Sequence, residues 1–85
     1  MKIVWTKHAE DRQKEWEKKL GITKQEVENA LNIPGQTVPG DMGVPVARKK
    51  TRNGLLRIPF REIDENLKIL TLYWTSKVEK YWKEE

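Results

Sequence analysis

The chain has 85 residues and a mass of 10.1 kDa, which suits one domain over residues 1–85 and excludes two. It contains no cysteine, so disulfides, thiol nucleophiles and thiolate metal sites are excluded and a cytoplasmic location is expected. No apolar run is long enough to span a membrane, and the first residues do not form a signal segment. Membrane insertion and secretion are therefore not expected.

The net charge of +4 is concentrated in the middle of the chain. The segment from Val44 to Arg61 has no acid, and its six cations are Arg48, Lys49, Lys50, Arg52, Arg57 and Arg61. Four of the five arginines lie here, and the planar guanidinium group matches the geometry of a phosphate. This concentration of charge predicts a polyanionic partner.

The first half of the chain predicts a short strand over 2–5 followed by two helices. Thr6 stands at the N-cap position of a helix over 7–20, which ends at Gly21. The sequence Thr23-x-x-Glu26 is a capping box for a second helix, from Lys24 to about Asn32.

The stretch that follows, up to Pro45, holds three of the four prolines and three of the five glycines. This composition predicts an irregular connection.

From Val44 onward the hydrophobic pattern has a period of two, and Asn53-Gly54 predicts a hairpin with a type I′ turn. In that register Lys50 faces Arg57. A second hairpin around 64–66 then sets Arg57 opposite Tyr73. Pro59 falls in an inner strand, where its missing N–H requires a bulge or an unpaired position.

This alternation separates an apolar face from a basic one. The apolar face, which is expected to receive both helices, holds Leu56, Ile58, Phe60, Leu70, Leu72 and Trp74. The basic face holds Arg48, Lys50, Arg52, Arg57, Arg61 and Tyr73, together with Leu55 and Ile69. Ser76 is expected to cap a short final helix over 77–85. The predicted fold is α+β with the order β-α-α-β-β-β-α: an antiparallel sheet, two helices on one face and a short C-terminal helix.

This element order, with cations on a three-stranded meander, resembles the RelE/ParE superfamily of small toxin ribonucleases. The motifs His8-Ala9-x-x-Arg12 and Gly21-Ile22-Thr23-x-x-Glu26-Val27 are similar to those of a related family of uncharacterised domains. The step Lys19-Leu20-Gly21-Ile22 resembles the corresponding step of BrnT toxins, with Leu in place of their His. The resemblance implies RNA as substrate and an antitoxin protein as partner.

Metal-independent RNA cleavage needs a 2′-OH directed at the adjacent phosphorus, donors for the developing charge and a proton donor for the leaving oxygen. Arg57 and Arg61 are candidate charge stabilisers, Tyr73 is a candidate base or stacking group, and Lys50 is a candidate partner in proton transfer. The candidate nucleic-acid contacts are Arg48, Lys50, Arg52, Arg57, Arg61, His8 and Arg12. A single His without Cys leaves no metal site to expect, and no cofactor motif is present.

Each candidate also has a structural interpretation. Cations on an open sheet face are common solubilising residues, Tyr73 can simply pack across a strand pair, and His8 and Arg12 can lie at the boundary of their helix. Leu55 and Ile69 on the basic face can support a homodimer or an antitoxin segment. The sequence thus predicts an RNA-binding domain that could act as a metal-independent toxin endoribonuclease. The alternative is a non-catalytic interaction module for nucleic acid or an acidic protein.

Overall fold

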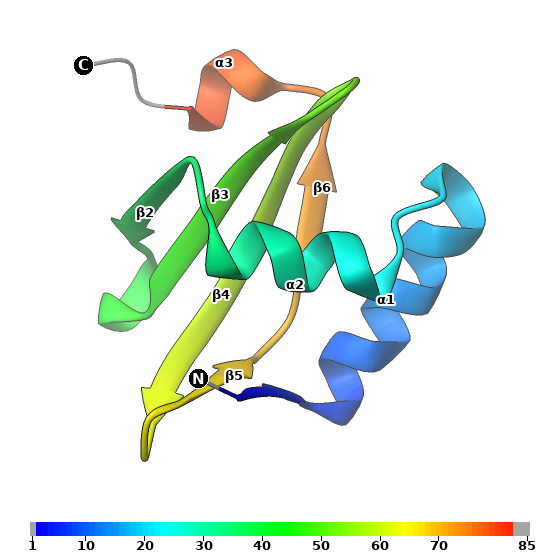
Figure 1. The fold of residues 1–85 in the computed structure, drawn as a ribbon. Coiled ribbons are helices and arrows are strands. Elements are labelled where there is room, and N and C mark those ends of the chain that lie inside the picture. The colour runs from blue at the N-terminus through cyan, green and yellow to red at the C-terminus, as the bar shows by residue number, and fades with distance from the viewer. Residues whose placement is uncertain (1, 83–85) are drawn as a thin grey trace.

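A twisted sheet with helices on both sides makes up the computed structural model, which describes residues 2–82 (Figure 1). The predicted α+β class is confirmed, and the predicted order is kept with two additions to the sheet. In chain order the elements are β1 (Ile3–Trp5), α1 (Lys7–Leu20), α2 (Lys24–Asn32), β2 (Gln36–Pro39), a 3₁₀ turn (Asp41–Gly43), β3 (Pro45–Thr51), β4 (Gly54–Ile63), β5 (Asn66–Ile69), β6 (Tyr73–Thr75) and α3 (Val78–Tyr81).

The predicted caps position the first two helices. The Thr6 hydroxyl accepts a hydrogen bond from the Ala9 N–H, and the Thr23 hydroxyl accepts one from the Glu26 N–H. Each bond satisfies a backbone donor that a helix start leaves free. Gly21 ends α1 in the left-handed conformation, with φ of 73°. None of the helices within residues 2–82 is long and apolar enough to cross a membrane.

The strands are ordered β1-β5-β4-β3-β2, with β6 pairing β4 beyond the end of β5 and β1 running parallel to β5. The prediction that residues 35–45 form an irregular connection is wrong, because Gln36–Pro39 pairs with β3 as an edge strand. Pro39 is tolerated there because it ends an edge strand, where a missing N–H interrupts no inner ladder.

The hairpin between β3 and β4 is shifted by two residues from the predicted register. Arg52 and Asn53 form its turn, neither has a positive φ, and the predicted type I′ turn at Asn53-Gly54 is therefore wrong. Gly54 is needed for a different reason, since a Cβ there would lie 2.3 Å from the Thr75 carbonyl oxygen. A shift of two preserves the alternation, so each residue stays on its predicted face.

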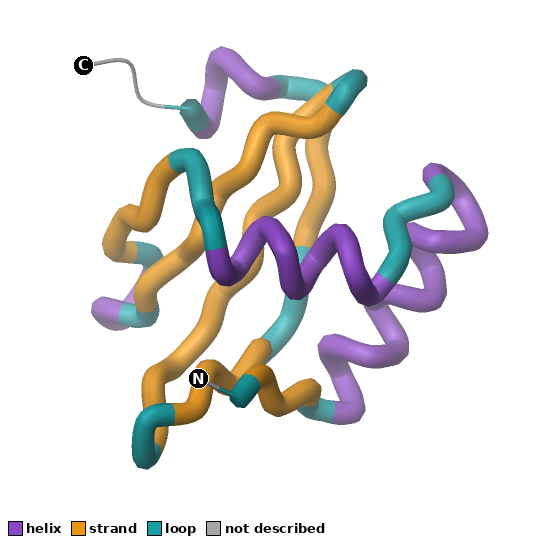
Figure 2. The backbone as a smooth tube through the Cα atoms, in the orientation of Figure 1, coloured by secondary structure: helices purple, strands orange, loops and turns teal. Residues whose placement is uncertain are grey.

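The next hairpin turns at Asp64 and Glu65, whose φ values of 50° and 67° match a type I′ turn. This tight turn puts β5 one residue out of the predicted register, so that Ile69 lies opposite Phe60. β6 keeps the predicted register, with Tyr73 opposite Arg57. The difference in register between β5 and β6 is taken up by the loop of residues 70–72 that connects them (Figure 2). Its Leu70 N–H donates to the carbonyl oxygen of Pro59, where the sequence predicts an interruption.

The core lies between the sheet and the first two helices. It contains Ala9 from α1, Val27, Ala30 and Leu31 from α2, the sheet residues Ala47, Leu56, Ile58, Leu67 and Ile69, and Leu72 from the loop between β5 and β6. Because β5 is one residue out of the predicted register, Ile69 occupies the core-facing position that was predicted for Leu70. Because Leu55 and Ile69 are both 0% exposed, the predicted dimer or antitoxin contact through them is wrong.

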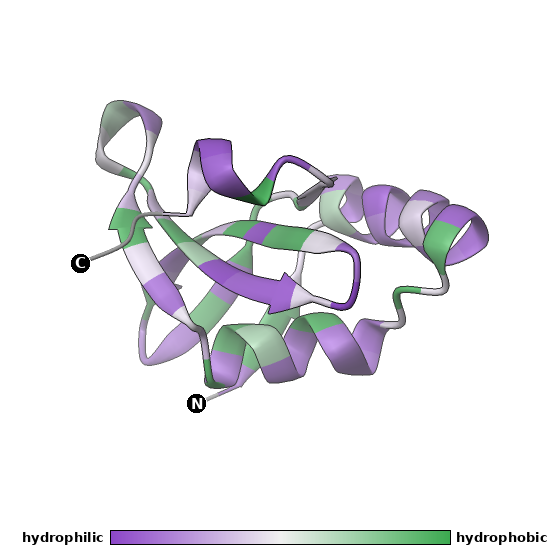
Figure 3. Ribbon diagram, turned by 90° about the horizontal axis from the view of Figure 1, so that it is seen from above, coloured by the Kyte–Doolittle hydropathy of each residue, from purple (hydrophilic) through white to green (hydrophobic). Residues whose placement is uncertain are grey.

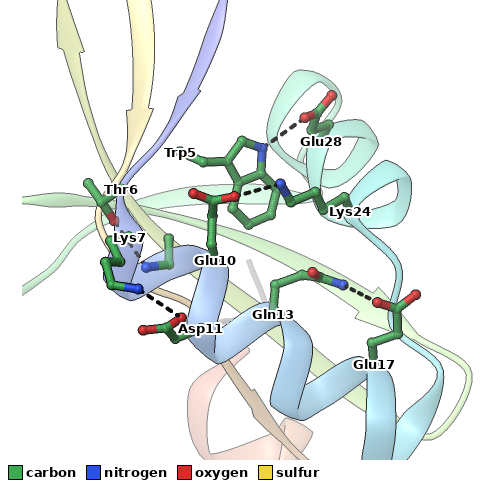
Figure 4. Close-up of polar contacts among 10 residues, drawn as sticks. Trp5, Thr6, Lys7, Glu10, Asp11, Gln13, Glu17, Lys24 and Glu28 are labelled. Atoms are coloured by element: carbon green, nitrogen blue, oxygen red, sulfur yellow. Dashed lines mark hydrogen bonds and ion pairs between the residues drawn. The ribbon is translucent and has the colours of Figure 1, made fainter.

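Polar contacts join the first helix to the second (Figure 4). The Lys24 ammonium lies 2.9 Å from a Glu10 carboxylate oxygen and 5.0 Å from the centre of the Trp5 ring. The hydrogen bond from Lys24 lowers the pKa of Glu10 below its ordinary value. The buried Gln13 amide donates to the Ile22 carbonyl oxygen at 2.9 Å, which fixes the connection between the helices.

The C-terminal segment lies on the other side of the sheet from α2 (Figure 3). The predicted Ser76 cap is wrong, because α3 begins after Lys77 and the Thr75 hydroxyl accepts the Lys77 N–H. The helix ends at Tyr81. The prediction that Trp82 belongs to this helix is wrong, because its backbone is extended, and the predicted residues 83–85 lie outside the described residues.

Candidate nucleic-acid interface

A groove of about 570 Å³ lies on the basic face of the sheet. Its walls are the turn that joins β2 to β3 on one side and α3 on the other. Val46, Pro59 and Leu70 supply apolar lining. The polar side chains that line it are Asp41, Arg48, Arg57, Thr71, Tyr73 and Tyr81.

Arg48 is the deepest cation of the groove, with 8% of its surface exposed. One guanidinium nitrogen donates to the backbone carbonyl of Tyr81, while the Nε has no hydrogen-bond partner in the described chain. Burial lowers the pKa of Arg48, and the nearby charge of Arg57 lowers it further. A buried cation next to a like charge is stabilised by an anion, and the groove gives an anion access to it.

Arg57 lies directly opposite Arg48 in the β3–β4 pair. Its guanidinium carbon is 4.1 Å from the centre of the Tyr81 ring and 5.7 Å from the centre of the Tyr73 ring. These contacts orient the side chain, but rings do not neutralise its charge. The Arg57 Nε and the Thr71 hydroxyl also lack a hydrogen-bond partner in the described chain.

No carboxylate compensates these two arginines within residues 2–82. The ion pairs of that range are Lys7 with Asp11, Arg12 with Glu15 and Lys24 with Glu10. Two opposed guanidinium groups therefore line one groove, beside two Nε atoms and a Thr71 hydroxyl that are buried without a partner in the described chain. Such a set can bind a phosphate by charge and by hydrogen bonds.

Tyr73 joins this set to α1. Its ring is 39% exposed, and the Arg12 guanidinium carbon lies 5.6 Å from the ring centre. Trp16, one turn further along α1, packs on Trp74 with a centroid distance of 6.2 Å. Because neighbouring residues of a strand point to opposite faces, α1 contacts both faces at the open edge of β6. Arg12 thus reaches the basic face from a helix whose Ala9 belongs to the core.

The other predicted site residues lie outside the groove. The predicted opposition of Lys50 and Arg57 is wrong: Lys50 lies opposite Leu55, and its ammonium sits 4.4 Å from the centre of the Trp82 ring. Arg52 is exposed in the hairpin turn, and Arg61 is exposed opposite Lys68. His8 is exposed on α1. Contributions from these four residues stay predictions.

Sequence reasoning missed Thr71, Tyr81 and Asp41. Thr71 enters the groove only because the strand is interrupted beside Pro59, which local patterning locates without giving its geometry. Tyr81 falls in the predicted final helix, but the sequence does not indicate on which face of the sheet that helix packs. Asp41 is the last acid before the basic segment, and its position on that side of Val44 was the available signal.

The described residues 2–82 contain no cluster of three His, Cys, Asp or Glu side chains that could hold a metal ion. Comparisons with protein-family models, with curated proteins and with solved structures found no match for this chain.

Proposed function

We propose that this domain binds RNA, with a backbone phosphate at Arg48 and Arg57. The observation that carries the proposal is the direct opposition of these two guanidinium groups without a carboxylate partner in the described chain. Opposed like charges destabilise a strand pair, and a phosphate bound to both offsets their repulsion by attracting each of them. A cytoplasmic location belongs to the same proposal.

Two further features favour RNA over a simple anion. Tyr73 is partly exposed beside Arg57, and an aromatic ring next to a cation is a common stacking surface for unpaired bases. Lys50, Arg52 and Arg61 extend the positive charge of β3, β4 and their turn beyond the groove. A chain of phosphates can contact several such cations at once and release their counterions.

RNA cleavage without a metal, with an antitoxin partner, is the stronger form of this proposal. Tyr73 lies between the Arg12 and Arg57 guanidinium groups at 5.6 and 5.7 Å from its ring centre. A phenol in that position can accept or donate a hydrogen bond at the 2′-OH, while Arg57 stabilises charge on the phosphate oxygens.

The binding proposal is tested by fluorescence anisotropy with single-stranded RNA at low salt. Arg57→Gln is expected to weaken binding about tenfold, because a charge-assisted phosphate contact is worth about 1.5–3 kcal/mol. Lys18→Gln makes the same charge change on the exposed part of α1 and is expected to alter affinity less than about twofold. Absence of binding, or equal losses in the two variants, contradicts the proposal.

Cleavage is tested with the same RNA in excess chelator. Products that end in a 2′,3′-cyclic phosphate, and that disappear in Tyr73→Phe and Arg57→Gln, support a metal-independent endoribonuclease. Intact RNA under conditions of full binding contradicts cleavage and leaves the binding function in place.

The second candidate function is an interaction module for an acidic protein segment. A separate groove of about 560 Å³ lies between α2 and the β3–β4 hairpin, with Leu56 and Ala30 in its lining and the 72% exposed Ile33 at its edge. Lys49 and Arg52 line the same groove. This combination fits an amphipathic segment that carries acids beside apolar residues.

Lys49→Glu with Arg52→Glu separates the two functions. If the groove between α2 and the hairpin binds the partner, an acidic peptide is expected to lose its affinity for this variant. The loss of RNA affinity caused by Arg57→Gln is expected to persist. A peptide that still binds the double variant with full affinity contradicts the second candidate.

A further inference from the structure

We propose that the groove on the basic face holds a single guanine nucleotide of the RNA. The phosphate lies at Arg48 and Arg57, and the Asp41 carboxylate receives the guanine edge. This inference rests on the proposed RNA binding and adds a base preference to it. It assigns a role to the one acidic side chain that lines the groove among the described residues.

The groove has the size and composition of a nucleotide site. Its volume of about 570 Å³ lies within the range of about 300–1,000 Å³ that is usual for small-molecule sites. One end carries the buried Arg48, whose Nε has no partner in the described chain, and the middle is lined by Val46, Pro59 and Leu70. An apolar surface next to a phosphate-binding end suits a flat base attached to a charged group.

The separation between the two ends suits one nucleotide. Arg48 lies four residues beyond Val44, where the turn ends, so at about 3.3 Å per residue the strand covers roughly 13 Å between them. An extended nucleotide has a comparable length from its phosphate to the far edge of its base. Asp41 stands in the turn at that far end.

The turn that carries Asp41 is held by its own backbone. The Gly40 N–H donates to the Val44 carbonyl oxygen at 2.7 Å, and the Val44 N–H donates to the Asp41 carbonyl oxygen at 3.2 Å. Gly40 is required because a Cβ there would lie 2.7 Å from the Val46 side chain. Asp41 is therefore presented by an exposed turn that backbone hydrogen bonds close, which lowers the entropy cost of using its side chain in recognition.

Guanine is the base whose chemistry matches a carboxylate. Its Watson–Crick edge presents two adjacent donors, the N1–H and the N2 amino group, and an ionised carboxylate offers two acceptor oxygens. Adenine and cytosine place an acceptor beside their amino donor, and uracil flanks its N3–H with two carbonyl oxygens. A carboxylate near a phosphate site repels the ligand unless the base supplies donors, so Asp41 favours guanine and disfavours the other three.

The test is titration of the full chain with guanosine monophosphate, adenosine monophosphate and inorganic phosphate. The guanine nucleotide is expected to bind at least about fivefold more tightly than the adenine nucleotide, the lower end of what a bidentate base contact supplies. Asp41→Asn is expected to reduce that preference below twofold while keeping the affinity for inorganic phosphate. Asp64→Asn, in the β4–β5 turn, removes the same charge away from the groove and is expected to keep the preference.

Equal affinities for the two nucleotides in the unmodified chain overturn the inference, as does a preference that survives Asp41→Asn. RNA binding without preference for guanine-containing oligonucleotides overturns it too, but leaves the proposed RNA-binding function standing. Absence of both RNA and phosphate binding overturns the two proposals together.

Discussion

Arg48 and Arg57 are directly opposed across β3 and β4, and the Arg48 guanidinium donates to the backbone carbonyl of Tyr81 on the segment that covers them. The fold thus holds two like charges together, and neither has a carboxylate ion-pair partner within residues 2–82. Close like charges oppose folding, and this opposition is largest when no anion is bound. The stability of the domain should therefore respond to anions.

Phosphate is expected to raise the melting temperature of the protein beyond the effect of chloride at matched ionic strength. A ligand that binds only the folded state at 100 times its dissociation constant adds about 2.7 kcal/mol, which corresponds to roughly 10 °C or more for a chain of this size. Differential scanning calorimetry over a phosphate series measures the shift.

Two arginine variants locate the source of that response. Arg57→Gln is expected to lose most of the phosphate-dependent shift and to melt higher than the unmodified protein in phosphate-free buffer, because the like-charge contact is gone. Arg61→Gln removes a charge from the same strand outside the groove and is expected to keep the shift. Identical responses of the two variants would show that phosphate acts through general charge screening.

Gly54→Ala is expected to destabilise the domain by about 1–3 kcal/mol, the usual cost of overpacking. The added Cβ would lie 2.3 Å from the Thr75 carbonyl oxygen and 2.5 Å from the Trp74 side chain, so β6 must move away from β4. Gly21→Ala is the comparison, since its position has φ of 73° but no atom within 4 Å. Gly21→Asn should recover much of the loss at that site, because Asn tolerates the left-handed conformation, whereas Gly54→Asn should not. Urea unfolding measures all four.

Gln13→Leu is expected to cost about 1–3 kcal/mol in the free energy of unfolding. The substitution places an apolar side chain at this buried position but removes the donor to the Ile22 carbonyl, which is then buried without a partner. Gln25→Leu removes a hydrogen bond to Asn29 on the exposed side of α2 and should change stability by less than about 0.5 kcal/mol. Similar losses in both variants would contradict a special role for the buried amide.

The contact between Glu10 and Lys24 predicts a pH-dependent contribution to stability. Because the pKa of Glu10 is lowered in the folded protein, its contribution is present above the unfolded pKa of about 4.3 and is lost as the pH falls through the folded value. Lys24→Gln should therefore lower stability at neutral pH, with the difference shrinking under acid.

Thermal melts between pH 2 and pH 7 follow this difference, and added salt should reduce it because both side chains are partly exposed. Lys18→Gln on α1 serves as the control for a general loss of positive charge. A stability difference between the Lys24 variant and the unmodified protein that is constant over this range would contradict the assignment.

Local chemistry in the sequence was sufficient to locate the helices and the two faces of the sheet. Thr6 and Thr23 cap where their side chains predict, since capping depends only on residues within one turn. The basic face survived an error of two residues in register, because alternation is insensitive to an even shift. The type I′ backbone occurs at Asp64 and Glu65 instead of Asn53-Gly54, because packing of Gly54 against Trp74 outweighs the intrinsic preference of that dipeptide.

The site was less accessible to sequence reasoning because it depends on contacts between distant elements. Arg57 and Tyr73 were paired correctly through strand register alone. The approach of Arg12 from α1 and the covering of Arg57 by Tyr81 require the helices to be placed in three dimensions. Patterning within one strand or helix carries no information on those distances.

The one-residue difference between the registers of β5 and β6 on β4 affects which sequence changes could alter the groove. Leu70 and Thr71 line the groove from the loop between β5 and β6, two strands that pair with β4 in registers that differ by one residue. Deleting one residue from that loop would give β5 and β6 the same register on β4, so that they could form one continuous strand. The groove would then lose the lining that the loop provides. Length changes at this point would therefore reshape the binding surface, and they are limited on one side by Leu72, which lies in the same stretch and belongs to the hydrophobic core.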